Sequence, residues 1–330
     1  MRARLLLPAA FLPLAAFGVM RSLEASAAPN YAALETAIVE LAASSIPGSS
    51  GTFPPVWDSG NDCANEPDWD VHAYNEDLYI LRQSKCDIFE APFLYMIFGE
   101  DNVLLLDTGA IQSASAHTWV DAALKNWEQV KGQPAPPLIV AHTHSHGDHT
   151  AGDFFFQGKP GVQEVVGLSA QDVHQFWGFQ DYPNDMPTID LGGRVLDVIG
   201  TPGHQAESVT LYDRETQLLL TGDIVYPGHL FVFSAADWPV FQDSILRLIQ
   251  FAATNPVQWV VGCHIEFSST PYVSYAWGTS VHPDEHPLQM PPQTLMQVFR
   301  AAREQGGDPE CTKYPNFVIH PVYKCGITWN

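Results

Sequence analysis

The chain has 330 residues, of which 46% are hydrophobic and 16% charged, enough for one large core but too short for two full-size domains with a linker. Its 37 Asp and Glu against 15 Lys and Arg give a formal net charge of −22. Because so acidic a surface repels phosphate backbones and anionic lipids, we expect neither nucleic acid nor a membrane as a partner. Such acidity is typical of a soluble exported protein.

The first residues have the pattern of a targeting segment. Arg2 and Arg4 precede an apolar run over 5–20, and the small residues ending at Ala27 fit a cleavage site. The run is shorter than the roughly 20 apolar residues that a membrane span needs, although an uncleaved anchor is the alternative. The pattern predicts a signal peptide over residues 1–27 and export to the periplasm or the extracellular space.

Five cysteines in an exported chain indicate disulfides with one thiol left over; they are Cys63, Cys86, Cys263, Cys311 and Cys325. Pairing Cys63 with Cys86 and Cys311 with Cys325 is the most economical arrangement, because each pair closes a short loop near a chain end. Sequence alone leaves the pairing open. Cys263 lies in an apolar run, which favours a buried free thiol.

The remaining pattern is a mixture of short β-rich runs and helices. Helical spacing predicts a helix at 31–44, and the stretch from 46 to 67, rich in Pro, Gly and Ser, predicts an irregular arm. The expected strands are 78–83, 93–98, 103–106, 138–141, 164–167, 195–199, 208–213, 217–221, 257–262 and 317–320, and further helices are expected at 114–130, 240–253 and 292–305. This mixture, without a fixed repeat, predicts an α/β sandwich with helices outside two sheets.

We therefore divide the chain into one domain with extensions. The expected parts are a signal peptide (1–27), an N-terminal helix and irregular arm (28–70), a catalytic domain (71–281) and a C-terminal extension packed on the same domain (282–330).

A histidine-rich motif, Thr143-His144-Ser145-His146-Gly147-Asp148-His149, directly follows the strand expected at 138–141. His144 and His146 are two residues apart, so in an extended segment their side chains point the same way. Three imidazoles and a carboxylate within six residues are a donor set that zinc prefers. A polar surface loop is the alternative, but it does not explain four such residues together. The neighbouring His142 is expected to pack or to hydrogen-bond.

This HxHxDH motif resembles the signature of the metallo-β-lactamase superfamily, and further pieces match in order. They are Asp107-Thr108-Gly109, Thr201-Pro202-Gly203-His204, Leu220-Thr221-Gly222-Asp223 and Gly262-Cys263-His264. The resemblance covers roughly residues 77 to 264. It implies an αββα sandwich of two mixed β-sheets flanked by helices, in the dinuclear zinc branch that is similar to hydroxyacylglutathione hydrolases and lactonases.

The resemblance also implies the ligands of two Zn²⁺ ions. His144, His146 and His204 would hold one ion; Asp148, His149 and His264 would hold the other; Asp223 would bridge them. A zinc-bound hydroxide would then attack a carbonyl or phosphoryl centre at neutral pH. Asp148 would orient the water or pass its proton to the leaving group.

Other side chains are weaker candidates. Tyr226 lies three residues beyond Asp223, an offset at which lactone-cleaving members carry a tyrosine, so it could hydrogen-bond the substrate carbonyl; aromatic packing is the alternative. His229, in a Pro-Gly-His turn, is a candidate substrate contact. Four aromatic residues could wall an apolar pocket or lie in the core: Trp57, Trp69, Tyr275 and Trp277.

The expected function is that of a secreted metal-dependent hydrolase of a small ester, lactone or thioester. Export argues against an intracellular glutathione thioester as the substrate. β-Lactam hydrolysis and phosphodiester hydrolysis are alternatives on the same fold, but zinc β-lactamases lack an aspartate at the position of Asp223 and acidity disfavours nuclease work. A mononuclear iron persulfide dioxygenase and a non-catalytic metal-stabilised binding protein are the other classes. No pattern indicates the oligomeric state.

Overall fold

The computed structural model describes residues 30–43 and 51–328. The expected signal peptide over 1–27 and its cleavage point near Ala27 therefore lie outside the described residues. From residue 32 onward the chain forms one compact unit. Within the described ranges, no helix combines the length and the apolar character that crossing a membrane requires.

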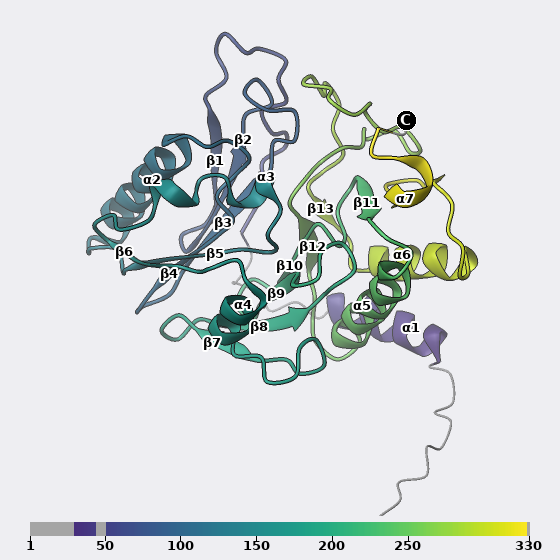
Figure 1. The fold of residues 1–330 in the computed structure, drawn as a ribbon. Helices are drawn as coiled ribbons and strands as arrows, with labels where there is room; N and C mark the ends of the chain where they lie inside the picture. Colours follow the sequence, from purple (N-terminus) through teal and green to yellow (C-terminus); the bar gives the residue numbers. More distant parts are fainter. Residues whose placement is uncertain (1–29, 44–50, 329–330) are drawn as a thin grey trace, which may run out of the picture. The chain divides into compact units, whose positions relative to one another are not determined.

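The first sheet has six strands in the order β1-β2-β3-β4-β5-β6 (Figure 1). They are β1 (Trp69–Asn75), β2 (Leu78–Gln83), β3 (Phe93–Phe98), β4 (Val103–Leu106), β5 (Leu138–Ala141) and β6 (Val162–Val165). Strands β1 to β4 pair antiparallel, whereas β5 is parallel to both β4 and β6. The sheet is therefore mixed, and its parallel part leads directly into the histidine-rich motif.

The second sheet is also mixed, in the order β13-β12-β10-β9-β8-β7. Its strands are β7 (Thr188–Asp190), β8 (Val195–Gly200), β9 (Val209–Asp213), β10 (Leu218–Gly222), β12 (Trp259–Gly262) and β13 (Gln289–Met290). Strands β10 and β12 are parallel, so their carboxyl ends lie at the same edge. The other pairs are antiparallel.

A small third sheet was not expected. In it β11 (His229–Val232) pairs with β15 (Val318–Pro321), which also pairs with β14 (Thr312–Lys313). The expectation of a turn at His229 is wrong, because this residue begins β11. The C-terminal region thus joins the catalytic part of the chain through backbone pairing.

The helices flank the sheets. They are α1 (Tyr31–Ala42), α2 (Ser115–Lys131), α3 (Gly147–Thr150), α4 (Ala170–Trp177), α5 (Asp237–Ala252), α6 (Gln293–Glu304) and α7 (Val322–Cys325), with a 3₁₀ turn at Asp153–Phe155. Alternating side chains of the first sheet explain the layers, because successive residues of a strand face opposite sides. Leu105 and Val140 pack with Val120 and Trp127 of α2.

The opposite face of the first sheet packs against the second sheet. Leu104 and Ile139 share a buried cluster with Leu211 and Leu220 of the second sheet. Beyond that sheet, α5 covers it: the ring of Phe251 lies 4.9 Å from Tyr212 of β9. The layers are therefore helix, sheet, sheet and helix, which confirms the expected αββα sandwich.

The cysteines pair as the short-loop argument favoured. Cys63 bonds to Cys86 and Cys311 to Cys325, with Cα–Cα separations of 5.5 and 6.3 Å. Cys263 is a buried free thiol.

Candidate metal centre

The seven candidate donors come from loops that follow four strands. The histidine-rich motif follows β5, His204 follows β8, Asp223 follows β10 and His264 follows β12. Loops at strand ends present polar side chains on a rigid frame, while the strands bury their own side chains in the core. The fold thereby brings together residues that are up to 120 positions apart in the sequence.

Asp107 fixes the position of the motif. It has a left-handed backbone (φ 71°) at the end of β4, and its carboxylate accepts hydrogen bonds from the backbone N–H and the hydroxyl of Thr143 at 2.8 and 2.9 Å. The same carboxylate lies 2.9 Å from His149 Nδ1. Gly222 (φ 54°) packs closely on the motif, because an added Cβ would lie 2.9 Å from the Cβ of Thr143.

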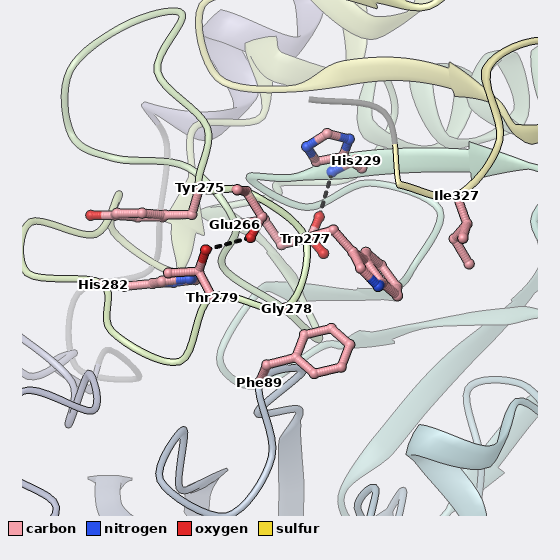
Figure 2. A pocket seen from close by; sticks show the side chains of 10 residues that line it. Phe89, His229, Glu266, Tyr275, Trp277, Gly278, Thr279, His282 and Ile327 are labelled. Atoms are coloured by element: carbon pink, nitrogen blue, oxygen red, sulfur yellow. Dashed lines mark hydrogen bonds between the residues drawn. The ribbon is translucent and has the colours of Figure 1, made fainter.

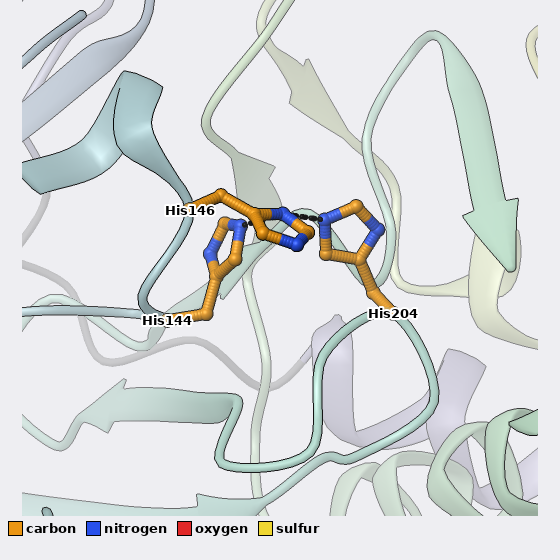
Figure 3. Close-up of side chains that lie close together, drawn as sticks. All are labelled: His144, His146 and His204. Atoms are coloured by element: carbon orange, nitrogen blue, oxygen red, sulfur yellow. Dashed lines mark hydrogen bonds between the residues drawn. The ribbon is translucent and has the colours of Figure 1, made fainter. Parts of the chain in front are cut away.

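The first group of donors is a trio of histidines (Figure 3). His146 Nδ1 lies 3.0 Å from His144 Nε2 and 2.9 Å from His204 Nε2. The rings of His144 and His204 are buried, and that of His146 is partly exposed. Three ring nitrogens thus converge on one another.

The second group holds two carboxylates and two histidines: Asp148, His149, Asp223 and His264. Asp148 Oδ2 lies 3.3 Å from the Nε2 atoms of both His149 and His264. Asp223 Oδ2 lies 3.4 Å from the same two nitrogens. It also lies 3.9 Å from His144 Nε2 and 3.7 Å from His204 Nε2, which places it between the two groups.

The far side of three of the five rings is held by a hydrogen-bond acceptor of the protein. His204 Nδ1 lies 3.1 Å from the carbonyl oxygen of Phe231, and His264 Nδ1 lies 2.9 Å from that of Glu90. Asp107 holds His149 Nδ1 in the same way. The Nε2 atoms of these three histidines therefore face the donor cluster. Metal-binding histidines are oriented in this way, because an acceptor at one nitrogen fixes the tautomer that presents the other.

The donor set fits a metal site with nitrogen and oxygen ligands, as zinc prefers. Nitrogen or oxygen ligands at zinc distances on a tetrahedron lie roughly 3.4 Å apart, and most separations above are close to that value. Asp223 Oδ1 is buried and has no hydrogen-bond partner among the described residues. An unpartnered carboxylate oxygen beside converging ring nitrogens is what a cation would satisfy.

The two groups of donors differ in the direction in which the pKa values of their histidines are shifted. Burial lowers the pKa of His204 to about 4, and burial with His149 nearby holds the pKa of His144 well below its ordinary value. Burial alone would raise the pKa of Asp223, but His264 and His149 hold it well below the usual range. Asp148 and Asp223 in turn raise the pKa of His149 despite burial. Without metal, protonated histidines of the second group balance the negative charge of its carboxylates. Bound divalent cations would displace these protons.

A pocket of about 300 Å³ opens above both groups. Its lining includes donor side chains, Tyr226, four further aromatic or aliphatic side chains and two carboxyl groups that are not donors. Those that the sequence did not single out are Glu90, Phe231, Phe233, Glu266 and Ile327. Phe231 and Phe233 alternate along and just beyond β11, a strand whose existence the sequence pattern did not reveal, and Glu266 lies two residues beyond His264.

The other candidates have defined positions. The Tyr226 ring lines the pocket, but its hydroxyl donates to the backbone carbonyl of His229, so its catalytic role stays a prediction. His229 lies outside this pocket and faces a smaller hollow; its Nδ1 lies 2.8 Å from His320 Nδ1. His142 Nε2 lies 2.8 Å from Asp153 Oδ1, away from the donors. Of the aromatic candidates, Trp277 lines the pocket, whereas Trp57 and Trp69 lie in the core.

An αββα sandwich with a His/Asp donor cluster at the carboxyl ends of its strands defines a metal-dependent class of protein. The sequence model of the metallo-beta-lactamase superfamily matches residues 89–254, which include six of the seven donors, all except His264. The chain belongs to the metallo-beta-lactamase superfamily.

Curated relatives include two kinds of enzyme. The chain is 25% identical to the acyl-coenzyme A thioesterase MBLAC2 of Homo sapiens over 165 residues, which cover 42% of this chain and 59% of that protein. It is 24% identical to a hydroxyacylglutathione hydrolase of Chelativorans sp. (strain BNC1) over 179 residues, covering 53% and 66%. The match thus spans less than two thirds of each relative.

Among solved structures, the chain is similar to a metallo-beta-lactamase from Pontibacter korlensis. It is 18% identical with a TM-score of 0.47, and the match covers 72% of this chain and all of that one.

Proposed function

We propose that the protein is an exported hydrolase with two zinc ions that cleaves a small ester, lactone or thioester. The observation that carries the proposal is the convergence of seven donor atoms in two groups, with Asp223 Oδ2 between them, beneath a pocket. The named activities of the two relatives, both thioester hydrolysis, support the reaction class.

Bound zinc would supply a Lewis acid and would lower the pKa of a water molecule to near 7. The protein's own residues do the rest. Asp148, with 21% of its side chain exposed, faces the pocket and would hold a proton on its way to the leaving group. The carbonyls of Phe231 and Glu90 hold His204 and His264 rigid, so that the donors need no rearrangement during the reaction.

The thioester reaction balances as a simple hydrolysis. Water adds to the carbonyl carbon, the carbon–sulfur bond breaks, and the products are a carboxylic acid and a thiol that takes up the proton. Phe233, Trp277 and Ile327 form apolar walls that would limit the entry of bulk water beside the substrate.

The test combines metal analysis with turnover. The purified mature protein is analysed for zinc and iron, and it is assayed on a lactone, a thioester, a cephalosporin and a phosphodiester. We expect two zinc ions per chain and hydrolysis of the lactone or the thioester. One iron per chain with oxygen consumption on a persulfide would contradict the proposal and support the dioxygenase class.

Export has its own test. We expect the amino terminus of protein recovered from the culture medium or the periplasm to begin just after Ala27. Recovery of the full-length chain in the cytoplasm only would show that this part of the proposal is wrong.

A further inference from the structure

The pocket above the donor cluster is lined mainly by aromatic and acidic side chains and by the donors themselves. Besides the donors, four aromatic rings and two carboxyl groups line it: Tyr226, Phe231, Phe233, Trp277, Glu90 and Glu266. Among the described residues that line it, none is Lys or Arg. A site that binds phosphate or carboxylate groups commonly uses Arg or Lys, because these side chains neutralise the anion and donate to its oxygens.

Several basic residues of the described chain are engaged elsewhere. Arg82 forms an ion pair with Glu285 at 2.6 Å, a pair that is buried. Next to strands β8 and β9, Arg194 binds Asp213 at 2.5 Å and Arg214 binds Asp197 at 2.6 Å. With a formal net charge of −22, the chain as a whole also repels an approaching anion.

The aromatic rings run from the donors to the rim. Phe233 lies 5.3 Å from the His146 ring and 6.2 Å from Phe231, which lies 5.8 Å from Trp277. Phe233 is 37% exposed and Ile327 is 40% exposed, so the wall reaches solvent. The face of an aromatic ring attracts a cation within about 6 Å of its centre, most strongly at Trp.

The two carboxyl groups are held beside these rings. The backbone of Glu90 is fixed by the contact of its carbonyl with His264, and Glu266 Oε2 accepts from the backbone N–H of His229 at 2.7 Å. Glu266, Trp277 and Ile327 line both this pocket and the neighbouring hollow, where Figure 2 shows them. Asp223, whose buried Oδ1 has no hydrogen-bond partner among the described residues, also lines the pocket, so the rings and the donors share one cavity.

The geometry points to a substrate that carries a positively charged, apolar group such as a quaternary ammonium, joined through an ester or thioester bond. This inference rests on the proposed hydrolase function and narrows it. The cation would lie on Trp277 and Phe231 near the carboxyl group of Glu90, and the carbonyl would lie over the donors. Neutral esters would fit the same walls less tightly, and substrates with phosphate or carboxylate groups would be disfavoured.

The experiment compares thioesters that share one acyl group and differ in charge. The metal-containing enzyme is assayed with butyrylthiocholine (cationic), S-butyryl-N-acetylcysteamine (neutral), S-butyrylglutathione and butyryl-coenzyme A (both anionic). We expect kcat/KM for butyrylthiocholine to exceed that for both anionic substrates by about 10-fold or more, equivalent to about 1.4 kcal/mol. Equal or higher kcat/KM for an anionic substrate would overturn the inference.

Two variants test the residues. Glu90→Gln removes a charge without changing size, and we expect it to lower the preference for butyrylthiocholine over S-butyrylglutathione by about 3-fold. Glu304→Gln, on the exposed face of α6, is the matched control and should leave that ratio unchanged. Trp277→Leu should raise KM for butyrylthiocholine more than for the neutral thioester. If neither Glu90→Gln nor Trp277→Leu changes the ratios, the assigned residues are wrong.

A binding measurement separates the two proposals. Benzyltrimethylammonium and benzenesulfonate have the same ring and opposite charges, and calorimetric titration of the metal-containing enzyme should detect binding of the cation only. Preferential binding of benzenesulfonate would overturn the inference even if all variants misfold. If no substrate of any charge is hydrolysed, the proposed function fails; if anionic thioesters are hydrolysed best, only the charge preference fails.

Discussion

Two buried polar clusters of this protein contain histidines and carboxylates, yet they are built differently. In the Arg82 cluster (Arg82, Lys85, His282 and Glu285), the guanidinium binds both oxygens of Glu285 at 2.6 Å, and His282 Nδ1 lies 2.8 Å from Oε1. Each negative charge there faces a positive one. In the donor cluster of seven residues, ring nitrogens face ring nitrogens, and Asp223 Oδ1 has no hydrogen-bond partner in the part of the chain that the structure describes.

The difference shows which cluster needs a ligand. Arg82 holds the pKa of Glu285 below its ordinary value although burial alone would raise it, so this pair is ionised and complete within the chain. Buried ring nitrogens that converge on one another and on a carboxylate oxygen are satisfied together when a cation occupies the space between them. Removing a residue from the first cluster should therefore destabilise the fold, whereas removing one from the second should abolish metal binding and activity.

The largest expected effect is that of His146→Ala. Because His146 Nδ1 is the central atom of the histidine trio, the variant should lose about 10³-fold or more in kcat/KM, equivalent to about 4 kcal/mol. The free energy of unfolding of the metal-free variant should change by less than about 1 kcal/mol, since the side chain is only partly buried. Kinetics, zinc analysis and urea denaturation measure these quantities.

The control for this variant is His286→Ala, which removes a histidine that does not line the pocket. It should keep zinc and activity. Wild-type turnover by purified His146→Ala would show that the trio does not hold a functional metal.

The next effect is on stability. Glu285→Ala leaves the charge of Arg82 buried without its partner, so the free energy of unfolding should fall by about 3–5 kcal/mol. The double variant Arg82→Met/Glu285→Leu removes both charges and should recover most of the loss. Chemical denaturation measures both. A loss of less than 1 kcal/mol in Glu285→Ala would mean that the two clusters do not differ as argued.

A smaller effect should come from a residue that supports the donors without belonging to them. Asp107→Asn replaces the acceptor of His149 Nδ1, and zinc affinity should fall by about 10- to 100-fold. Asp153→Asn is the matched control, because Asp153 contacts His142, which is not a donor. Competition with a chelator gives both affinities. Equal affinities in the two variants would contradict a positioning role for Asp107.

The sequence predicted the donor cluster better than the pocket above it. Each donor follows a strand whose apolar run is visible in the sequence, such as 138–141 and 217–221, which the structure contains as Leu138–Ala141 and Leu218–Gly222. Their order along the chain resembled the family, and the family match confirms that resemblance.

The pocket depends on contacts that no local pattern encodes. Strand β11 has only four residues, and its pairing partner β15 lies about 90 residues further along the chain. Phe231 and Phe233 acquire their positions through that pairing, and Ile327 through the chain after β15. Their roles therefore became visible only in three dimensions.

The smallest expected effect concerns the stability of the fold at acid pH, to which a contact between two further buried histidines contributes. His229 Nδ1 lies 2.8 Å from His320 Nδ1, and burial lowers the pKa of each to about 4. An unfolded histidine titrates near about 6.5, so the unfolded state binds more protons between these values. Stability from the pair is therefore present above the unfolded pKa and is lost as the pH falls toward 4, with a limiting slope of about 1.4 kcal/mol per pH unit for each proton.

His229→Gln removes one of these titrating groups, so the decline in unfolding free energy from pH 6.5 to pH 4.5 should become shallower by up to about 1 kcal/mol per pH unit. Urea denaturation of the metal-free protein across this range measures the slope, with His117→Gln on α2 as the control. Metal-free protein is essential because the donor histidines also exchange protons when zinc dissociates. A slope that stays unchanged in His229→Gln would mean that the pair already shares a proton in the folded state. The contact would then be a third kind of cluster, which neither a counterion nor a metal stabilises.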